Sequence, residues 1–236
     1  MKNHLRISEH FYSLQGEGKT MGIPSVFLRL QACNLLCDNK WRCDTIEVWI
    51  KGEKHTIEET LDLFEKKYER KLFKGSHLVI TGGEPLIQQD MIIEFLKQYY
   101  ERFFYIPYIE IETNGTINPK DELIKLVNLF NVSPKLSNAG MTEKRRIKAE
   151  AIHKFNLIEN SIFKFVIGDN EDWKELNDTY LKPFKIRKEK IHLMPSADDS
   201  EMLKKHSQYV AELCKKNVFN YSSRLQIELW NKTTGV

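Results

Sequence analysis

Short apolar segments alternate with amphipathic segments along most of the chain, and this alternation restricts the fold more than any other feature. Six apolar runs of strand length are separated by stretches whose apolar residues recur every three or four positions, as on a helix with one buried face. Strands joined through helices form right-handed crossovers and run parallel in one sheet. The predicted strands are 25–30, 77–81, 105–112, 129–133, 162–167 and 191–194, and the predicted helices are 56–68, 88–100, 119–128, 143–156, 171–182 and 200–216.

Six strand–helix repeats are fewer than the eight that close a complete barrel. The 236 residues contain no internal repeat, low-complexity tract or Pro/Gly/Ser-rich linker, so one domain over 1–236 is expected. The predicted fold class is therefore α/β, with the architecture of a partial, open (β/α)6 barrel. Thr56 and Glu59 are expected to form a capping box, and the alternating stretch 225–229 is expected to be an edge strand.

The composition excludes several classes of protein. No apolar run approaches the roughly 18 residues of a membrane span, and the N-terminus has no stretch resembling a secretory signal. A net charge of only +3 argues against nucleic acid as a partner, and the basic run 144–146 is expected to be a solvated helix face. We therefore expect a cytoplasmic protein, whose thiols stay reduced.

The four cysteines divide into a cluster and an isolated residue. Cys33, Cys37 and Cys43 lie within eleven residues, spaced C-x3-C-x5-C, whereas Cys214 follows the apolar stripe of a predicted helix and is expected to pack in the core. Thiolates select zinc, copper(I) or iron–sulfur clusters. No His pair completes a structural zinc site, so three thiolates with one open position favour an iron–sulfur cluster that also binds a small molecule.

Conformationally special and polar residues follow the predicted strands at their carboxyl ends. These segments include Gly82-Gly83-Glu84-Pro85, 113–115, 133–135 and 195–196. Because ligands bind at the carboxyl ends of parallel strands, this rim is the predicted site. Arg29 stands between two leucines of an apolar strand, so its side chain must face the barrel interior or water. We favour the interior, where a guanidinium could bind a ligand carboxylate in bidentate fashion.

The motifs resemble the radical S-adenosylmethionine (SAM) superfamily and, within it, the 7-carboxy-7-deazaguanine synthase family. The resemblance covers nearly the whole chain and rests on the cysteine triad together with residues 11–35, TGGEPL (81–86), IETNGT (111–116), VSPK (132–135), FKFV (163–166), LMP (193–195) and the terminal LWNKTTGV. The superfamily usually has C-x3-C-x2-C. The second gap is longer here, and Cys43 is assigned as the third ligand because Asp44-Thr45 follows it, with the insertion bulging within 38–42.

The resemblance implies a lyase of 7-deazapurine (queuosine-type) biosynthesis. It would convert 6-carboxy-5,6,7,8-tetrahydropterin to 7-carboxy-7-deazaguanine with loss of ammonia. A [4Fe–4S] cluster would cleave SAM reductively to a 5′-deoxyadenosyl radical, which would take a hydrogen from the pterin and later return one, so that SAM is regenerated. Mg²⁺, an electron donor such as flavodoxin and a homodimeric state are also implied.

The resemblance also implies residue roles, with no catalytic residue beyond the cluster and SAM. The three clustered cysteines would hold the cluster, Thr45 would bind Mg²⁺, and Gly82 and Gly83 would let the backbone approach SAM closely. The other predicted SAM contacts are Glu84 (accepting from the ammonium), Gly115, Ser133, Pro134, Lys135, Met194, Pro195 and Ser196. The predicted substrate contacts are Leu14, Gln15, Gly16, Arg29, Thr113 and Val236.

Three alternatives remain open from the sequence. A different radical SAM enzyme, such as a glycyl-radical activase, would share the cysteines and TGGEP but should lack the Gln15–Gly18 segment. A non-enzymatic zinc or iron–sulfur binding module would need basic and aromatic residues near the cysteines. A degenerate family member would have lost a competent cluster through its altered triad. The sequence does not reveal whether the product enters tRNA, DNA or a metabolite.

Overall fold

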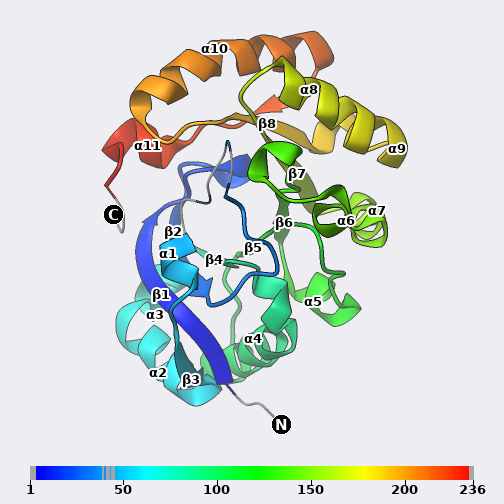
Figure 1. Ribbon diagram of the computed structural model, residues 1–236. Coiled ribbons are helices and arrows are strands. Elements are labelled where there is room, and N and C mark those ends of the chain that lie inside the picture. The colour runs from blue at the N-terminus through cyan, green and yellow to red at the C-terminus, as the bar shows by residue number, and fades with distance from the viewer. Residues whose placement is uncertain (1–3, 39, 41–42, 44–45, 234–236) are drawn as a thin grey trace.

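One mixed sheet organises the chain. The computed structural model describes residues 4–38, 40, 43 and 46–233. Within these residues nine strands are joined in the order β3-β1-β2-β4-β5-β6-β7-β8-β9, and Figure 1 shows the curved sheet with helices around its outside. The strands are β1 (His4–Leu14), β2 (Pro24–Leu30), β3 (Glu53–Thr56), β4 (His77–Gly82), β5 (Ile109–Thr113), β6 (Leu129–Val132), β7 (Ser161–Ile167), β8 (Ile191–Pro195) and β9 (Asn220–Tyr221).

The six strands from β2 to β8 other than β3 are neighbours in chain order and run parallel. At one edge β1 and β3 are antiparallel, and at the other edge β9 adds a short parallel strand. Because β3 and β9 end the sheet without pairing to one another, the barrel is open. The predicted partial (β/α)6 barrel is confirmed, with β1, β3 and β9 added to it.

The helices of the described residues lie between and after these strands, and most of them cover the outer face of the sheet. They are α1 (Ile46–Trp49), α2 (Ile57–Lys67), α3 (Glu69–Phe73), α4 (Gln89–Phe103), α5 (Asp121–Leu126), α6 (Glu143–Arg146), α7 (Ala149–Leu157), α8 (Asn170–Leu176), α9 (Lys182–Phe184), α10 (Ser200–Asn217) and α11 (Leu225–Trp230).

The main core fills the space between the sheet and these helices. Phe64 of α2 meets Phe95 and Tyr99 of α4 edge to face, and all three side chains are fully buried. Such aromatic pairs add about 0.5–1.5 kcal/mol each beyond the area they bury. All seven residues of β7 are buried, as expected for a parallel strand covered on both faces. A charged residue on such a strand, Lys164, therefore needs a partner inside the barrel.

Two local predictions are confirmed. The Thr56 N–H donates to Glu59 Oε2 over 2.7 Å and the Glu59 N–H donates to Thr56 Oγ1 over 3.1 Å, which is the capping box at the start of α2. Cys214 is 5% exposed and packs in the main core, where its thiol donates to the Asn220 carbonyl over 3.3 Å. Cys214 therefore lies apart from the three clustered cysteines.

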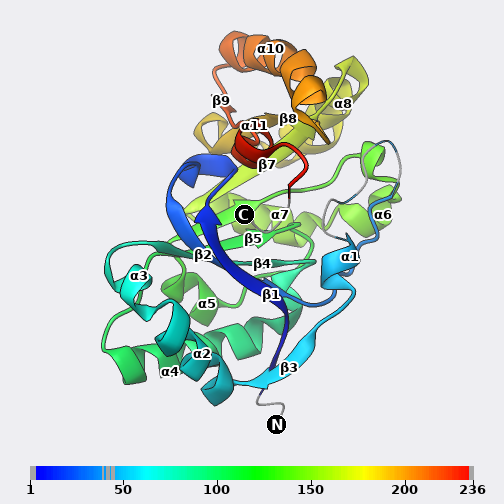
Figure 2. The ribbon, with the colours of Figure 1, turned by 90° about the vertical axis from the view of Figure 1, so that its left-hand side faces the viewer.

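The C-terminal prediction is wrong, because 225–229 lies within helix α11 rather than an edge strand. Of its alternating apolar residues only Ile227 is buried, so the alternation does not mark a strand with one buried face. The Leu225 N–H donates to the Gly16 carbonyl over 2.9 Å, and Figure 2 shows α11 beside the end of β1. The helix thus closes one side of the barrel mouth.

The predicted helix 143–156 is also interrupted, into α6 and α7, and its basic run is not uniformly solvated. Arg146 is only 4% exposed; its guanidinium pairs with Glu175 at 2.5 Å and donates to the Lys135 carbonyl over 3.1 Å. Burial of an Arg requires such partners. Arg146 therefore anchors the loop after β6 instead of forming a solvated face.

Candidate active site

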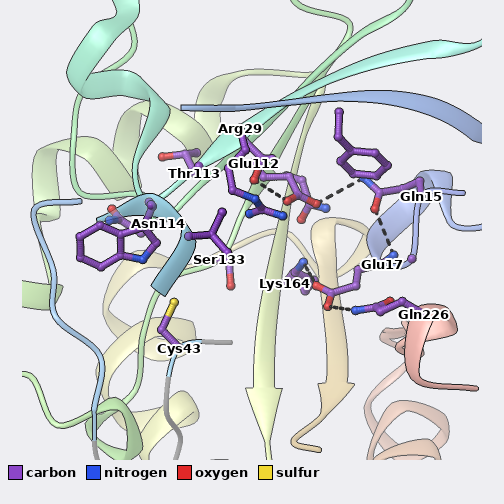
Figure 3. Close-up of a pocket in the computed structure, with 18 of the residues that line it drawn as sticks. Gln15, Glu17, Arg29, Cys43, Glu112, Thr113, Asn114, Ser133, Lys164 and Gln226 are labelled. Carbon is purple, nitrogen blue, oxygen red and sulfur yellow. Dashed lines mark hydrogen bonds and ion pairs between the residues drawn. The ribbon is translucent and has the colours of Figure 1, made fainter. Parts of the chain in front are cut away.

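A cavity of about 420 Å³ opens at the carboxyl ends of the parallel strands (Figure 3), at the predicted rim. Its wall is built from β1, β2 and the ends of β4, β5, β6, β7 and β8, with α1 and α11 at its margin. The predicted site residues that line it are Leu14, Gln15, Gly16, Arg29, Cys33, Cys37, Cys43, Gly82, Gly83, Thr113, Ser133, Lys135 and Met194.

Five predicted site residues lie beside this cavity without lining it, and their ligand roles stay predictions. They are Glu84, Gly115, Pro134, Pro195 and Ser196. Gly115 has a φ of 74°, and a Cβ there would lie 2.7 Å from Val132 Cγ1, so this turn requires glycine. Thr45 and Val236 lie outside the described residues.

The three clustered thiols share one end of the cavity. Cys33, Cys37 and Cys43 pack around Leu35, Val166 and Met194, and none of the three forms a disulfide. The Cys43 N–H donates to the Cys37 carbonyl over 3.0 Å, so these two cysteines stay adjacent despite the longer gap between them. Burial raises the pKa of Cys33 to about 11 and also raises that of Cys37. A bound cationic metal group would favour the thiolate forms.

These residues fit a cluster better than a single metal ion. Within the described residues no three His, Cys, Asp or Glu side chains form a ready set of ligands for one ion. A cubane cluster instead binds each thiolate at a different iron, which holds the sulfur atoms further apart. Gly83 lets the loop after β4 pack directly against the cysteine loop: a Cβ there would lie 2.4 Å from the Ala32 carbonyl oxygen and 2.6 Å from Cys33 Cβ.

Glu84 is fully buried and holds two loops together. Its carboxylate accepts from the Thr113 hydroxyl over 2.9 Å, from the Asn114 N–H over 2.7 Å and from the Leu86 N–H over 3.0 Å. Burial outweighs these hydrogen bonds and raises the pKa of Glu84 to about 7. In this structure the carboxylate therefore orders the loop after β5, and its contact with a SAM ammonium stays a prediction.

The predicted substrate residues are held by neighbouring carboxylates. Arg29 faces the barrel interior as predicted, and its Nε donates to Glu9 Oε1 over 2.7 Å. Gln15 is 2% exposed and donates from Nε2 to Glu110 over 3.0 Å and to Glu112 over 3.3 Å. Such partners fix both side chains before any substrate arrives, which favours discrimination between ligands.

A buried ionic network beside Gln15, whose Oε1 accepts from the Glu17 N–H over 3.3 Å, was not predicted from the sequence. Glu17 pairs with Lys164 of β7 and, at 3.2 Å, with Arg224 just before α11; Gln226 of α11 donates to the same carboxylate over 2.8 Å. Burial alone would raise the pKa of Glu17, but the two cations outweigh it and hold that pKa well below its usual range. Figure 3 shows Glu17, Lys164 and Gln226 meeting at the cavity wall.

A second unpredicted group surrounds two acidic residues of β5. Glu110 accepts from Gln15, from the Thr20 hydroxyl and from Asn131 (3.3 Å), while Glu112 accepts from the Thr81 hydroxyl over 2.9 Å. Burial, with the nearby Glu112 charge, raises the pKa of Glu110 to about 7. The alternating IEIE pattern of β5 was a usable signal, because a buried inner strand carries two carboxylates toward the site.

Comparison with known proteins identifies the family. A family model described as a 4Fe-4S single cluster domain matches residues 14–155, more than half of the chain. The 7-carboxy-7-deazaguanine synthase of Pyrobaculum aerophilum is 32% identical over 233 residues, covering 98% of this chain and 97% of the relative. That of Aquifex aeolicus is 33% identical over 216 residues, covering 90% and 87%.

A solved structure agrees on the fold. The crystal structure of QueE from Escherichia coli matches with a TM-score of 0.68 at 24% identity, covering 94% of each chain. No helix in the described part of this chain has the length and apolar character needed to cross a membrane. With relatives above 30% identity matched along most of their length, the chain belongs to the 7-carboxy-7-deazaguanine synthase family, as the resemblance of its motifs predicted.

Proposed function

We propose that this chain is a radical SAM lyase that converts 6-carboxy-5,6,7,8-tetrahydropterin to 7-carboxy-7-deazaguanine and ammonia. The observation that carries the proposal is the shared cavity, which three cysteine thiols outside any disulfide line at one end and preordered polar groups line at the other. Membership of the synthase family supports it. The glycyl-radical activase and the non-enzymatic binding module are less well supported, since the chain carries the Gln15–Gly18 segment beside its triad.

The cluster end of the cavity would be held by Cys33, Cys37 and Cys43. When bound, the reduced cluster and SAM supply the one-electron chemistry that starts hydrogen abstraction from the pterin. Gly82 and Gly83 are proposed to let the backbone approach SAM closely. Both glycines also pack tightly within the protein, where Cβ atoms would overlap the chain at Leu30 and Ala32. Glu84 is proposed to accept from the SAM ammonium. The remaining proposed SAM contacts, toward its carboxylate, ribose and adenine, are Gly115, Ser133, Pro134, Lys135, Met194, Pro195 and Ser196.

The other end of the cavity would bind the pterin. Arg29 is proposed to bind its carboxylate, since a guanidinium presents paired N–H donors to two oxygens. The backbone and amide of 14–16 would contact the ring edge, and Thr113 would add a hydrogen bond. Binding of both ligands within the cavity would limit the access of water to the reacting groups. We further propose Thr45 as an Mg²⁺ ligand, Val236 as a substrate contact, flavodoxin as electron donor, a homodimer and a cytoplasmic location.

The test is anaerobic reconstitution followed by reaction. The protein is loaded with iron and sulfide, then mixed with SAM, Mg²⁺, a reductant and the carboxylated tetrahydropterin, and the product is identified by mass spectrometry. We expect about four irons per chain, as a three-cysteine [4Fe–4S] site implies, and a deazaguanine product. Uptake of zinc in place of iron, or SAM cleavage without this product, would contradict the proposal.

Two cysteine variants provide a matched pair. Cys43→Ala removes a proposed ligand and should abolish the cluster, which would also exclude a degenerate site. Cys214→Ala removes a buried core thiol far from the cavity and should leave the iron content unchanged. The reverse pattern would overturn the ligand assignment.

A further inference from the structure

The side-chain amide of Asn114 directs one N–H toward the sulfur of Cys33, a proposed cluster ligand. Asn114 follows β5 directly, lines the cavity and is 5% exposed. Its Nδ2 lies 3.9 Å from the sulfur of Cys33, within range for an N–H···S hydrogen bond. The same sulfur accepts from the Leu35 N–H over 3.4 Å. Cys33 thus faces two N–H donors, one from the backbone and one from a side chain.

The orientation of the Asn114 amide is fixed by its neighbours. The backbone N–H of Thr116, which can only donate, points to Asn114 Oδ1 over 3.0 Å, so this atom is the oxygen. The Thr116 hydroxyl donates to the same oxygen over 2.6 Å and accepts from Asn34 Nδ2 over 2.7 Å. Asn34 Oδ1 in turn accepts from Asn114 Nδ2 over 2.9 Å. These bonds close a ring that uses one N–H of Asn114 and leaves the other directed at Cys33.

Glu84 holds the loop that carries Asn114 in place. Glu84 accepts the Asn114 backbone N–H over 2.7 Å, and the Glu84 N–H donates to the Ala32 carbonyl over 2.9 Å, one residue before Cys33. The buried carboxylate therefore ties the loop after β5 to the cysteine loop. This rigidity matters because a weak N–H···S contact changes the energy of a cluster only when its geometry is maintained.

We propose that Asn114 is a positioning residue that donates its side-chain N–H to the cluster-bound sulfur of Cys33 and raises the reduction potential of the cluster. An N–H donor stabilises the extra negative charge of the reduced cluster more than the oxidised form, and hydrogen bonds to sulfur are among the factors that set such potentials. The inference rests on the cluster in the proposed function, but not on the pterin reaction.

The experiment compares the reduction potential of the loaded parent with that of two variants by redox titration followed by EPR. Asn114→Ser keeps an oxygen that can accept from the Thr116 N–H in the same type of turn, but its side chain is too short to reach Cys33. Thr116→Val is the control, because it breaks the side-chain ring and leaves the Asn114 amide in place. Iron content is measured for each protein.

We expect Asn114→Ser to retain iron and to be reduced about tenfold less favourably, a shift of 59 mV to more negative potential for one electron. Thr116→Val should shift the equilibrium less than threefold. Equal potentials for Asn114→Ser and the parent, or an equal shift in both variants, would overturn the inference. A parent that takes up no iron would instead overturn the proposed function, and this inference with it.

A second measurement detects the nitrogen directly. The parent and Asn114→Ser are grown with asparagine labelled with ¹⁵N only in its side-chain amide, and the reduced clusters are examined by pulsed EPR. We expect a ¹⁵N coupling in the parent that is lost in Asn114→Ser; Asn34 directs its own Nδ2 to Thr116. Absence of that coupling in a fully loaded protein would overturn the assignment.

Discussion

The buried pairing of Glu17 with Lys164 and Arg224 gives a prediction that can be worked through quantitatively. The three side chains are 16%, 6% and 5% exposed, so their charges are largely shielded from water. Glu17→Gln removes the anion and leaves two cations facing each other inside the protein. Removing one partner of a buried ion pair costs about 3–5 kcal/mol, because the remaining charge is left uncompensated.

A double-mutant cycle separates this charge effect from simple loss of packing. Lys164→Met removes one of the two stranded cations, so Glu17→Gln with Lys164→Met should regain about 1–3 kcal/mol of the loss, within the range of coupling for contacting residues. Urea unfolding provides the free energies. A loss of about 4 kcal/mol corresponds to a fall in the urea midpoint of more than about 1 M.

The pH dependence offers an independent check with a definite sign. Because the folded pKa of Glu17 lies below its unfolded value, its stabilisation is complete above the unfolded pKa of about 4.3 and is lost as the pH falls toward the folded pKa. The difference between the parent and Glu17→Gln should therefore shrink below about pH 4. A single variant that loses less than about 1 kcal/mol at pH 7, or a double variant that loses the sum of the single effects, would refute the reasoning.

Three further outcomes are expected. Gly83→Ala places a Cβ 2.6 Å from Cys33 Cβ, so the amount of iron bound after reconstitution should fall severalfold. Full iron loading of this variant would contradict a role for the tight Gly83–Cys33 contact in cluster binding. A carboxyl pKa raised to about 7 makes the free energy of unfolding fall as the pH rises from about 4 to about 7. Glu110→Gln should therefore reduce this fall, as measured by urea unfolding at several pH values. An unchanged dependence on pH would exclude Glu110 as its source. Arg29→Lys should raise KM for the pterin about tenfold while SAM cleavage without pterin stays at the parent level, since one ammonium cannot replace a bidentate guanidinium; an unchanged KM would remove Arg29 from the substrate site.

The sequence was sufficient to predict the order of the parallel strands and the edge that carries the site. Strands such as β4 and β7 have near-continuous apolar runs that only a doubly covered sheet explains. The first strand was missed because most of β1 is only partly buried, so its pattern is mixed. The last segment was assigned to the wrong structure because its alternating apolar residues do not share one buried face: in α11 Ile227 is buried, whereas Leu229 is 52% exposed.

The sequence predicted the site residues that directly follow strands. It missed the ion pairs between residues that are far apart in the sequence. Lys164 and Arg224 lie 147 and 207 residues from Glu17, and no local spacing connects them. Lys164, like Arg29, is a lone charge between two apolar residues of a strand, here two buried phenylalanines. The same pattern therefore places its side chain inside the barrel. The sequence could not predict that Lys164 pairs with Glu17. That ion pair depends on how β7 and α11 pack against the segment after β1, which carries Glu17.

The central claim is that this cavity performs the ring contraction, and the most direct measurement is the stoichiometry of the anaerobic reaction of the loaded parent. Deazaguanine, ammonia and remaining SAM are quantified in the same samples over time. The account predicts one 7-carboxy-7-deazaguanine and one ammonia for each pterin consumed, with product exceeding the SAM lost because SAM is regenerated. SAM consumed without deazaguanine, or deazaguanine formed without an equal amount of ammonia, would contradict it.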